Sequence, residues 1–255
     1  MNCKILPKVE LHVHLDCCLS FEVVKKIRPD ISNLYYKEKF TGSSCSCLKD
    51  YISCADNAVE LMQTKEELEL VTIDLFDQLK SDNVVYVEIR FAPLLHTNKG
   101  LTPYEIVRII SEITSEQSKS TGIEAGLILC TLRHYSSSQS METVKLVNKF
   151  KNTNVVGFDI AADEAGHPLD NHIDAFKFAF ENKIFCTAHA GEALGPESVI
   201  ETLDKIKPLR IGHGVRSVED SSLLNKLKNN SIHLELCFTS NIVTKVYDNY
   251  MDHPI

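Results

Sequence analysis

The chain has 255 residues, of which 44% are hydrophobic, so it is long enough for one large α/β domain with an ample core. Its formal net charge of -8 argues against nucleic acid or an anionic membrane as the main partner. The sequence contains no run of about 18 apolar residues and no apolar signal core, so we expect a soluble cytoplasmic protein. Nine cysteines, an odd number in a chain of this size, are expected to be reduced thiols.

The first predicted strand, Val9 to Asp16 (VELHVHLD), places His12 and His14 on one face. Their Cα atoms lie roughly 6.6 Å apart at a rise of about 3.3 Å per residue, a spacing from which two imidazoles can converge on one metal ion. A lone His-x-His is more often two partly buried histidines that donate to carbonyl groups. The metal reading therefore needs further ligands later in the chain.

A long helical stretch separates this strand from the next one. A short helix ending at Pro29 is predicted in LSFEVVKKIRPDI, and helical periodicity runs through residues 55–62 and 65–80. The polar segment from Asn33 to Tyr51 is expected to be irregular. An insertion of about seventy residues is far longer than an ordinary βα connection, and such insertions tend to cover a site.

From Val84 onward, strands and helices alternate. Strands are predicted at residues 84–91, 124–130, 155–161, 184–189, 209–213 and 231–236, and helices at residues 140–150, 171–183, 196–206 and 218–230. Thr102, Pro103 and Glu105 form a capping box that opens a further helix. Alternation implies a parallel sheet, and no glycine-rich fingerprint follows the first strand, which disfavours a dinucleotide-binding sheet. We therefore predict one domain, residues 1–255, with a (β/α)8 barrel of the TIM type that lacks its last strand and helix units.

Chemistry in such barrels is found at the carboxyl ends of the strands. The residues at those predicted ends are mostly polar or ionisable: His12, His14, Asp16, Glu88, Arg90, Arg133, His134, Asp163, Glu164, His189, Glu192, His213, Thr239, Ser240 and Asn241. Histidines end three separate predicted strands. It is improbable that histidines would occupy all three positions only to fill the core. Three imidazoles without a thiolate pair favour zinc, with one position left for water.

Zinc would turn that water into a nucleophile near neutral pH. Glu192, three residues beyond His189, could then exchange a proton with the substrate, and His213 could hold or deprotonate the water. Considered alone, Glu192 is more often a solvated loop carboxylate. Its place beside His189 in the motif HAGE favours the catalytic interpretation.

Six motifs in order resemble the adenosine deaminase family of metal-dependent hydrolases, from about Pro7 to Pro254: VELHVHLD, VEIRFAP, DIAADE, HAGE, RIGHG and LELCFTSN. The resemblance implies a barrel with one zinc ion that converts adenosine or deoxyadenosine and water to inosine or deoxyinosine and ammonia in purine salvage. By matching position, it implies that the zinc ligands are His12, His14 and His189. It further implies that Glu192 protonates ring nitrogen 1 of the purine and that His213 orients and activates the hydroxide.

The resemblance also implies a pocket for a purine nucleoside. His14 would border this pocket, and Asp16 resembles the family's ribose-contacting aspartate. Ala162 stands where the family usually has a glycine whose N–H meets ring nitrogen 3, so a methyl group enters the pocket and a positive φ is disfavoured. Leu48 and Tyr51 resemble the apolar helix that closes over the nucleoside, although ordinary core is an equally good reading for them.

One departure affects the expected activity. The family carries a Thr-Asp-Asp-Pro motif on strand eight, and the first aspartate of this motif is the fourth metal ligand. This sequence contains no such Asp-Asp pair. We therefore expect weaker metal binding and little or no turnover from these 255 residues.

Three functions remain open on the sequence. The first is a zinc aminohydrolase of adenosine, with a small-molecule purine nucleoside as the only partner expected and the oligomeric state left open. The second is a relative that acts on an N6-modified adenine nucleotide or another amidohydrolase substrate, and the third is a non-catalytic purine-binding remnant. DIAADE contains no lysine to bridge two metals, and the absence of H-x-E with PCxxC excludes the cytidine-type scheme.

Overall fold

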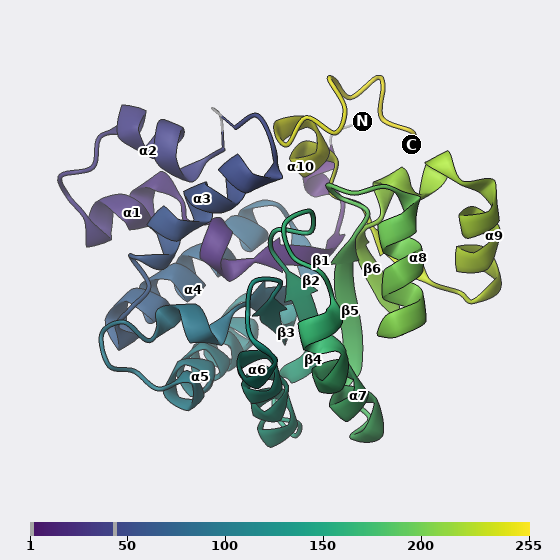
Figure 1. Cartoon of the computed structure of the whole chain (residues 1–255). Coiled ribbons are helices and arrows are strands. Elements are labelled where there is room, and N and C mark those ends of the chain that lie inside the picture. The colour runs from purple at the N-terminus through teal and green to yellow at the C-terminus, as the bar shows by residue number, and fades with distance from the viewer. Residues whose placement is uncertain (1–2, 43–44) are drawn as a thin grey trace. The chain divides into compact units, whose positions relative to one another are not determined.

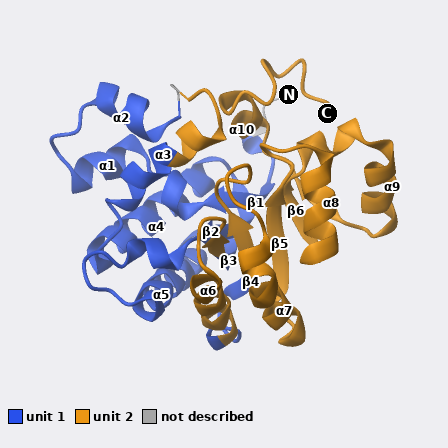
Figure 2. Cartoon of the chain, in the orientation of Figure 1, with its two compact units in different colours: residues 1–43, 53–129, 149–156 blue, residues 44–52, 130–148, 157–255 orange. Residues whose placement is uncertain are grey.

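The computed structural model describes residues 3–42 and 45–255. Figure 1 shows its helices and strands, and Figure 2 shows the two compact units into which the chain divides. Unit 1 comprises residues 1–43, 53–129 and 149–156, and unit 2 comprises residues 44–52, 130–148 and 157–255. Within these described residues, seven strands follow one another in chain order, β1 to β7. The expectation of one domain over residues 1–255 stays a prediction.

Unit 1 contains a parallel arrangement of β1 (Lys8–His14), β2 (Val84–Phe91) and most of β3 (Glu124–Leu132). Its helices are α1 (Phe21–Ile27), α2 (Asn33–Phe40), most of α3 (Leu48–Val59), α4 (Lys65–Ser81) and α5 (Pro103–Thr121). The predicted capping box of α5 is confirmed, because the Thr102 hydroxyl accepts the Glu105 N–H and the Glu105 carboxylate accepts the Thr102 N–H. Register places His14 beside Arg90 at the carboxyl ends of β1 and β2.

The prediction that residues 33–51 are irregular was wrong for residues 33–40 and 48–51 and correct for residues 41–42 and 45–47, whereas residues 43–44 lie outside the described residues. Helix α2 occupies residues 33–40, and α3 begins at Leu48. No residue of α2 is buried, so the sequence has no apolar stripe there by which a helix could be recognised. The helix is instead started by Ser32, whose hydroxyl accepts the N–H of Tyr35 at 3.2 Å.

Unit 2 contains most of β4 (Val155–Ala161), then β5 (Phe185–Ala190), β6 (Arg210–His213) and β7 (His233–Glu235), with neighbouring strands parallel. Its helices are most of α6 (Ser137–Lys149), then α7 (Ile173–Glu181), α8 (Pro196–Lys205), α9 (Ser221–Asn229) and α10 (Phe238–Val243). The predicted strands and helices are confirmed, with boundaries that shift by a few residues. Helix α10 was missed, because its six residues are too few to show a helical period.

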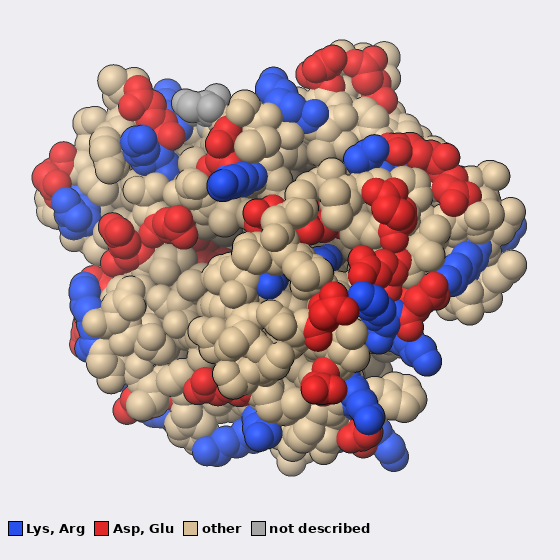
Figure 3. Space-filling view, viewed as in Figure 1, with Lys and Arg blue, Asp and Glu red and all other residues tan. Residues whose placement is uncertain are grey.

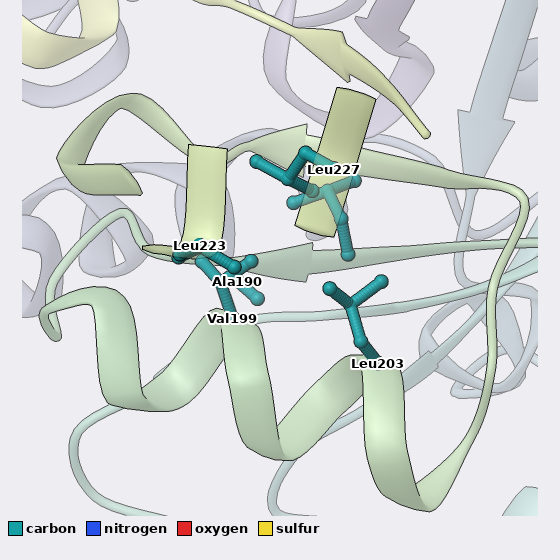
Figure 4. Close-up of a cluster of buried hydrophobic side chains, with 6 residues drawn as sticks. Ala190, Val199, Leu203, Leu223 and Leu227 are labelled. Atoms are coloured by element: carbon teal, nitrogen blue, oxygen red, sulfur yellow. The ribbon is translucent and has the colours of Figure 1, made fainter. Parts of the chain in front are cut away.

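A compact apolar cluster supports the ends of β5 and β6. It consists of Ala190, Val199, Leu203, Ile211, Leu223 and Leu227. Figure 4 shows side chains of α8 and α9 directed toward one another over these strands. Burial of each leucine contributes about 2 kcal/mol, so the cluster holds the strand ends firmly in unit 2.

Acidic and basic side chains share one face of the molecule. Figure 3 shows acidic and basic residues interspersed on the face in view. Among the described residues, no helix combines the length and the apolar character needed to cross a bilayer.

Candidate active site

The carboxyl end of β5 carries His189, which is buried and faces Asp159 of β4. The Nδ1 atom of His189 lies 3.1 Å from Oδ2 of Asp159, whose side chain is fully buried. The other oxygen, Oδ1, accepts the N–H of Ile160 at 2.8 Å. Because a carboxylate only accepts hydrogen bonds, it favours the tautomer with the proton on Nδ1. The Nε2 atom of His189 is then a lone-pair donor, as a metal ligand must be.

Glu192 lies in the turn after β5 and contacts two other predicted site residues. Its Oε2 is 3.3 Å from Nε2 of His213, at the end of β6, and its Oε1 accepts the Ser240 hydroxyl at 3.2 Å. The rings of His213 and His189 are 5.3 Å apart between centroids. These four side chains therefore form one group inside unit 2.

Burial raises the pKa of the Glu192 carboxyl to about 7. The negative charge of Glu164 raises it further, whereas His189 and the hydrogen bond from Ser240 oppose the shift. A carboxyl with this pKa is partly protonated at neutral pH. It can therefore act as a proton donor, which a solvated glutamate cannot do efficiently.

Tight turns after β5 and β6 bring these side chains together. Gly191 and Gly214 have φ of 66° and 67°, and a Cβ would lie 2.6 Å from Val199 Cγ2 at the first and 2.8 Å from Leu234 Cδ2 at the second. Gly191 in HAGE and Gly214, the last residue of RIGHG, are therefore required by space as well as by conformation. His213 has φ of 65°, a left-handed conformation that costs a non-glycine residue about 1 kcal/mol or more. Strain of this kind is concentrated at functional positions.

The remaining predicted metal and ribose residues lie in unit 1. The rings of His12 and His14 are 5.4 Å apart, as expected for one strand face, although the register with β2 shifts between Glu10 and Val13. Asp16 is buried, and its Oδ2 accepts the N–H of Ala92 at 3.2 Å while its Oδ1 lies 3.8 Å from Nδ1 of His14. Burial raises the pKa of the Asp16 carboxyl to about 6.

Histidines suited to hold a metal ion occur in both units. They include His12 in unit 1 and His189 and His213 in unit 2. The assignment of His12, His14 and His189 as the ligand set stays a prediction.

A cavity of about 360 Å³ in unit 2 is lined by Glu192 and by one of the predicted substrate residues, Leu48. Arg216 and Tyr247 also line it. Tyr51, the other residue predicted on this helix, is half-buried. Glu192 therefore has an open volume beside it.

Ala162, predicted to line the base pocket, follows β4 with φ of 79°. The sequence indicated that a positive φ would be disfavoured for this alanine, and the chain adopts it nevertheless. The methyl group therefore carries strain of about 1 kcal/mol, which a glycine would not have.

Several other predicted strand-end residues have structural contacts. Glu88 accepts the Tyr86 hydroxyl at 2.9 Å, and Arg90 donates to the Leu11 carbonyl at 2.6 Å. Arg133 is buried and donates to the His189 carbonyl at 3.1 Å. These contacts hold strand ends in place.

Two residues support the candidate site through contacts that were not predicted from the sequence. Asp159 could have been found from its place inside the apolar strand GFDIA, because a carboxylate buried in a strand needs a partner. Glu164 was named only as a strand-end residue, and it accepts four main-chain N–H groups from residues 191–194. No sequence signal indicates those partners, since main-chain amides are present at every position.

The sequence profile of the adenosine deaminase family matches residues 7–255. An adenosine deaminase from Clostridium acetobutylicum is 36% identical over 257 residues, which cover 98% of this chain and 77% of the relative. The chain belongs to the adenosine deaminase family.

Solved structures agree with this membership. Arabidopsis ADAL in complex with IMP aligns with a TM-score of 0.86 at 25% identity, over 98% of this chain and 76% of that chain. The N6-mAMP deaminase MAPDA from Arabidopsis aligns with a TM-score of 0.86 at 25% identity, over 98% of this chain and 78% of that chain. The predicted fold class, an α/β barrel of the TIM type, is therefore confirmed.

As a member of the adenosine deaminase family, the protein is a hydrolase that acts on C–N bonds. The family is metal-dependent, and the histidines described above include residues suited to a metal ion.

Proposed function

We propose that this member of the adenosine deaminase family is a zinc-dependent aminohydrolase of adenosine and deoxyadenosine. Its products would be inosine or deoxyinosine and ammonia. The observation that carries the proposal is the buried contact of Glu192 with His213, beside a His189 held by Asp159. It joins a proton donor, a base and a prepared metal ligand in one unit.

The imidazoles present suit zinc. Asp159 binds the proton on Nδ1 of His189, so Nε2 can face a metal, and neutral imidazole nitrogen is a preferred zinc ligand. We assign the zinc ion to His12, His14 and His189. When bound, zinc supplies an activated water near neutral pH.

The chain's own residues supply the proton transfers. Glu192, with its pKa raised to about 7 by burial, donates a proton to ring nitrogen 1 and makes carbon 6 more electrophilic. His213 accepts a proton from the attacking water through its ring. A C–O bond forms at carbon 6 and the C–N bond to the amino group breaks. The proton that His213 took from the water leaves with the amino group as ammonia, and the remaining proton of the water passes to Glu192, which restores the acid.

Positions around the acid donor would bind the nucleoside. Leu48 lines the cavity that contains Glu192, and Tyr51 lies one helical turn further along α3. The main-chain N–H of Ala162 would donate to ring nitrogen 3. We assign the ribose contact to Asp16 and a border of the pocket to His14.

Product analysis tests the proposal directly. The chain, loaded with Zn²⁺, is incubated with adenosine or deoxyadenosine at high protein concentration, and inosine and ammonia are measured by chromatography and a coupled assay. We expect slow inosine formation by the wild type, in keeping with the low turnover expected from the sequence, and a rate lower by about 10³-fold or more for Glu192→Gln. A zinc-loaded wild type that binds adenosine without converting it would refute the aminohydrolase proposal and favour a purine-binding protein.

A second candidate substrate is an N6-modified adenine nucleotide. It is favoured by the likeness to the N6-mAMP deaminase and to ADAL in complex with IMP. The same assay with N6-methyl-AMP and AMP separates the two candidates. Faster release of IMP from N6-methyl-AMP than of inosine from adenosine would replace the nucleoside with the nucleotide as substrate.

A further inference from the structure

Glu164 lies just beyond β4 and is almost fully buried, with 3% of its surface exposed. Its carboxylate accepts the Ser198 hydroxyl and the main-chain N–H groups of four consecutive residues, Gly191 at 2.7 Å, Glu192 at 3.1 Å, Ala193 at 2.7 Å and Leu194 at 3.0 Å. Five donors thus converge on one side chain. Nothing in the reaction proposed above uses them.

The turn after β5 depends on this carboxylate for its hydrogen bonds. Residues 191–194 belong to neither a strand nor a helix, and buried amides without partners would cost about 1–3 kcal/mol each. A charged acceptor makes hydrogen bonds roughly twice as strong as a neutral one. Glu164 therefore accepts the hydrogen bonds of the main-chain N–H groups in this turn. It also favours the one main-chain conformation in which all four N–H groups point to the same carboxylate.

This path decides where Glu192 points. The N–H of Glu192 and those of both its neighbours are bound to Glu164. The side chain that leaves this restrained segment reaches His213 and Ser240. The Ser198 hydroxyl, in the first turn of α8, attaches the same carboxylate to the helix that follows.

We infer that Glu164 is the positioning residue for Glu192: it fixes the main chain at residues 191–194 so that the acid carboxyl is aimed at the reacting ring. This inference rests on the proposed function, in which Glu192 donates the proton. A misplacement of about 1 Å in such a group costs about 100-fold in rate. The effect should fall on turnover rather than on substrate binding, because Glu164 is assigned no contact with the nucleoside.

The test compares Glu164→Gln with a matched control, Glu235→Gln. The glutamine amide group has the same shape but one of its two acceptor oxygens becomes a donor, so at least two of the five donors lose their acceptor. Glu235 is buried to a similar degree, lies on β7 of the same unit and pairs with Arg210 at 2.8 Å. It undergoes the same chemical change on a different element.

Three measurements are made on the zinc-loaded proteins: kcat and KM for adenosine, thermal midpoint, and hydrogen exchange of the amides at residues 191–194. For Glu164→Gln we expect kcat to fall about 100-fold with KM changed less than about threefold, and exchange in the turn to be about tenfold faster. For Glu235→Gln we expect a lower midpoint, with kcat and the exchange of the turn close to wild type.

Equal kcat values for the two variants, or unchanged exchange at residues 191–194 in Glu164→Gln, would overturn the inference. If Glu164→Gln does not fold, Glu164→Asp takes its place, because it keeps the carboxylate but shortens the side chain by one methylene. A kcat of Glu164→Asp equal to that of the wild type would likewise contradict the positioning role of Glu164. A wild type that releases no inosine would refute the proposed function instead. The exchange comparison would still decide whether Glu164 holds the turn.

Discussion

His189 and Asp159 form a buried pair in which Nδ1 of the imidazole lies 3.1 Å from Oδ2 of the carboxylate. The carboxylate comes from β4 and the imidazole from β5, so the sheet itself sets their spacing. Because Nδ1 is engaged, the ring can turn only Nε2 toward a metal ion. The pair therefore determines both the tautomer and the orientation of a proposed zinc ligand.

Replacement of Asp159 by asparagine should weaken zinc binding by about 10–100-fold, because the amide holds the imidazole less firmly and lowers its basicity. Affinity is measured by competition with a chelator of known zinc affinity. Asp170→Asn, at an exposed carboxylate that pairs with Lys205, is the control and should bind zinc like the wild type. Equal affinity in Asp159→Asn and wild type would contradict a supporting role for this carboxylate.

The pH dependence of turnover should report the protonation of Glu192. Burial raises its pKa to about 7, and the protonated form is the active acid, so kcat/KM should fall about tenfold per pH unit as the pH rises beyond about 7. Glu192→Gln should lose activity by about 10³-fold or more. Glu201→Gln, at a half-buried position of α8 whose carboxylate pairs with Lys205, serves as the control and should keep the wild-type profile. A rate that stays flat up to about pH 9 would rule out Glu192 as the proton donor.

The left-handed conformation at Ala162 predicts a stabilising substitution. Ala162→Gly should raise the free energy of unfolding by about 1 kcal/mol, because glycine adopts φ of 79° without a Cβ clash. The matched control is Ala161→Gly, one residue earlier in β4, where the same change removes a buried methyl group and should lower the free energy by about 1 kcal/mol. Denaturant unfolding of the wild type and of the two variants measures these free energies. A destabilised Ala162→Gly would mean that the methyl contacts outweigh the strain.

His96, fully buried after β2, should make stability depend on pH. Burial lowers the pKa of its imidazole from 6.5 to about 4, so the unfolded chain binds the proton more readily than the folded one between these values. Stability from this group is therefore complete above about pH 6.5 and is lost as the pH falls toward about 4.

Between about pH 7 and about pH 5, the wild type should lose about 2 kcal/mol more unfolding free energy than His96→Gln, which has no titrating ring. The same substitution at the exposed His167 is the control, and its unfolding free energy should depend on pH as that of the wild type does. Parallel pH profiles for the wild type and His96→Gln would show that the buried ring does not titrate as described.

The sequence indicated most of the secondary structure because strands and helices leave periodic apolar patterns. Residues 84–91 and 155–161 were predicted with the bounds that the structure has. Helices α2 and α10 were missed, since one buries no side chain and the other has six residues. Apolar periodicity reflects which side chains face a core. A helix that has no apolar stripe therefore cannot be recognised from this periodicity.

By itself, the order of residues determined the family, the alternation of strands and helices, and the identity of the ionisable side chains at the strand ends. Those features depend on local spacing and on residue type. Only the tertiary structure decided that Asp159 supports His189, that Glu164 holds the turn of Glu192, and that His213 and Ala162 adopt a positive φ. These facts arise from contacts between segments far apart in the chain, and from main-chain groups that every residue carries, so no local pattern encodes them.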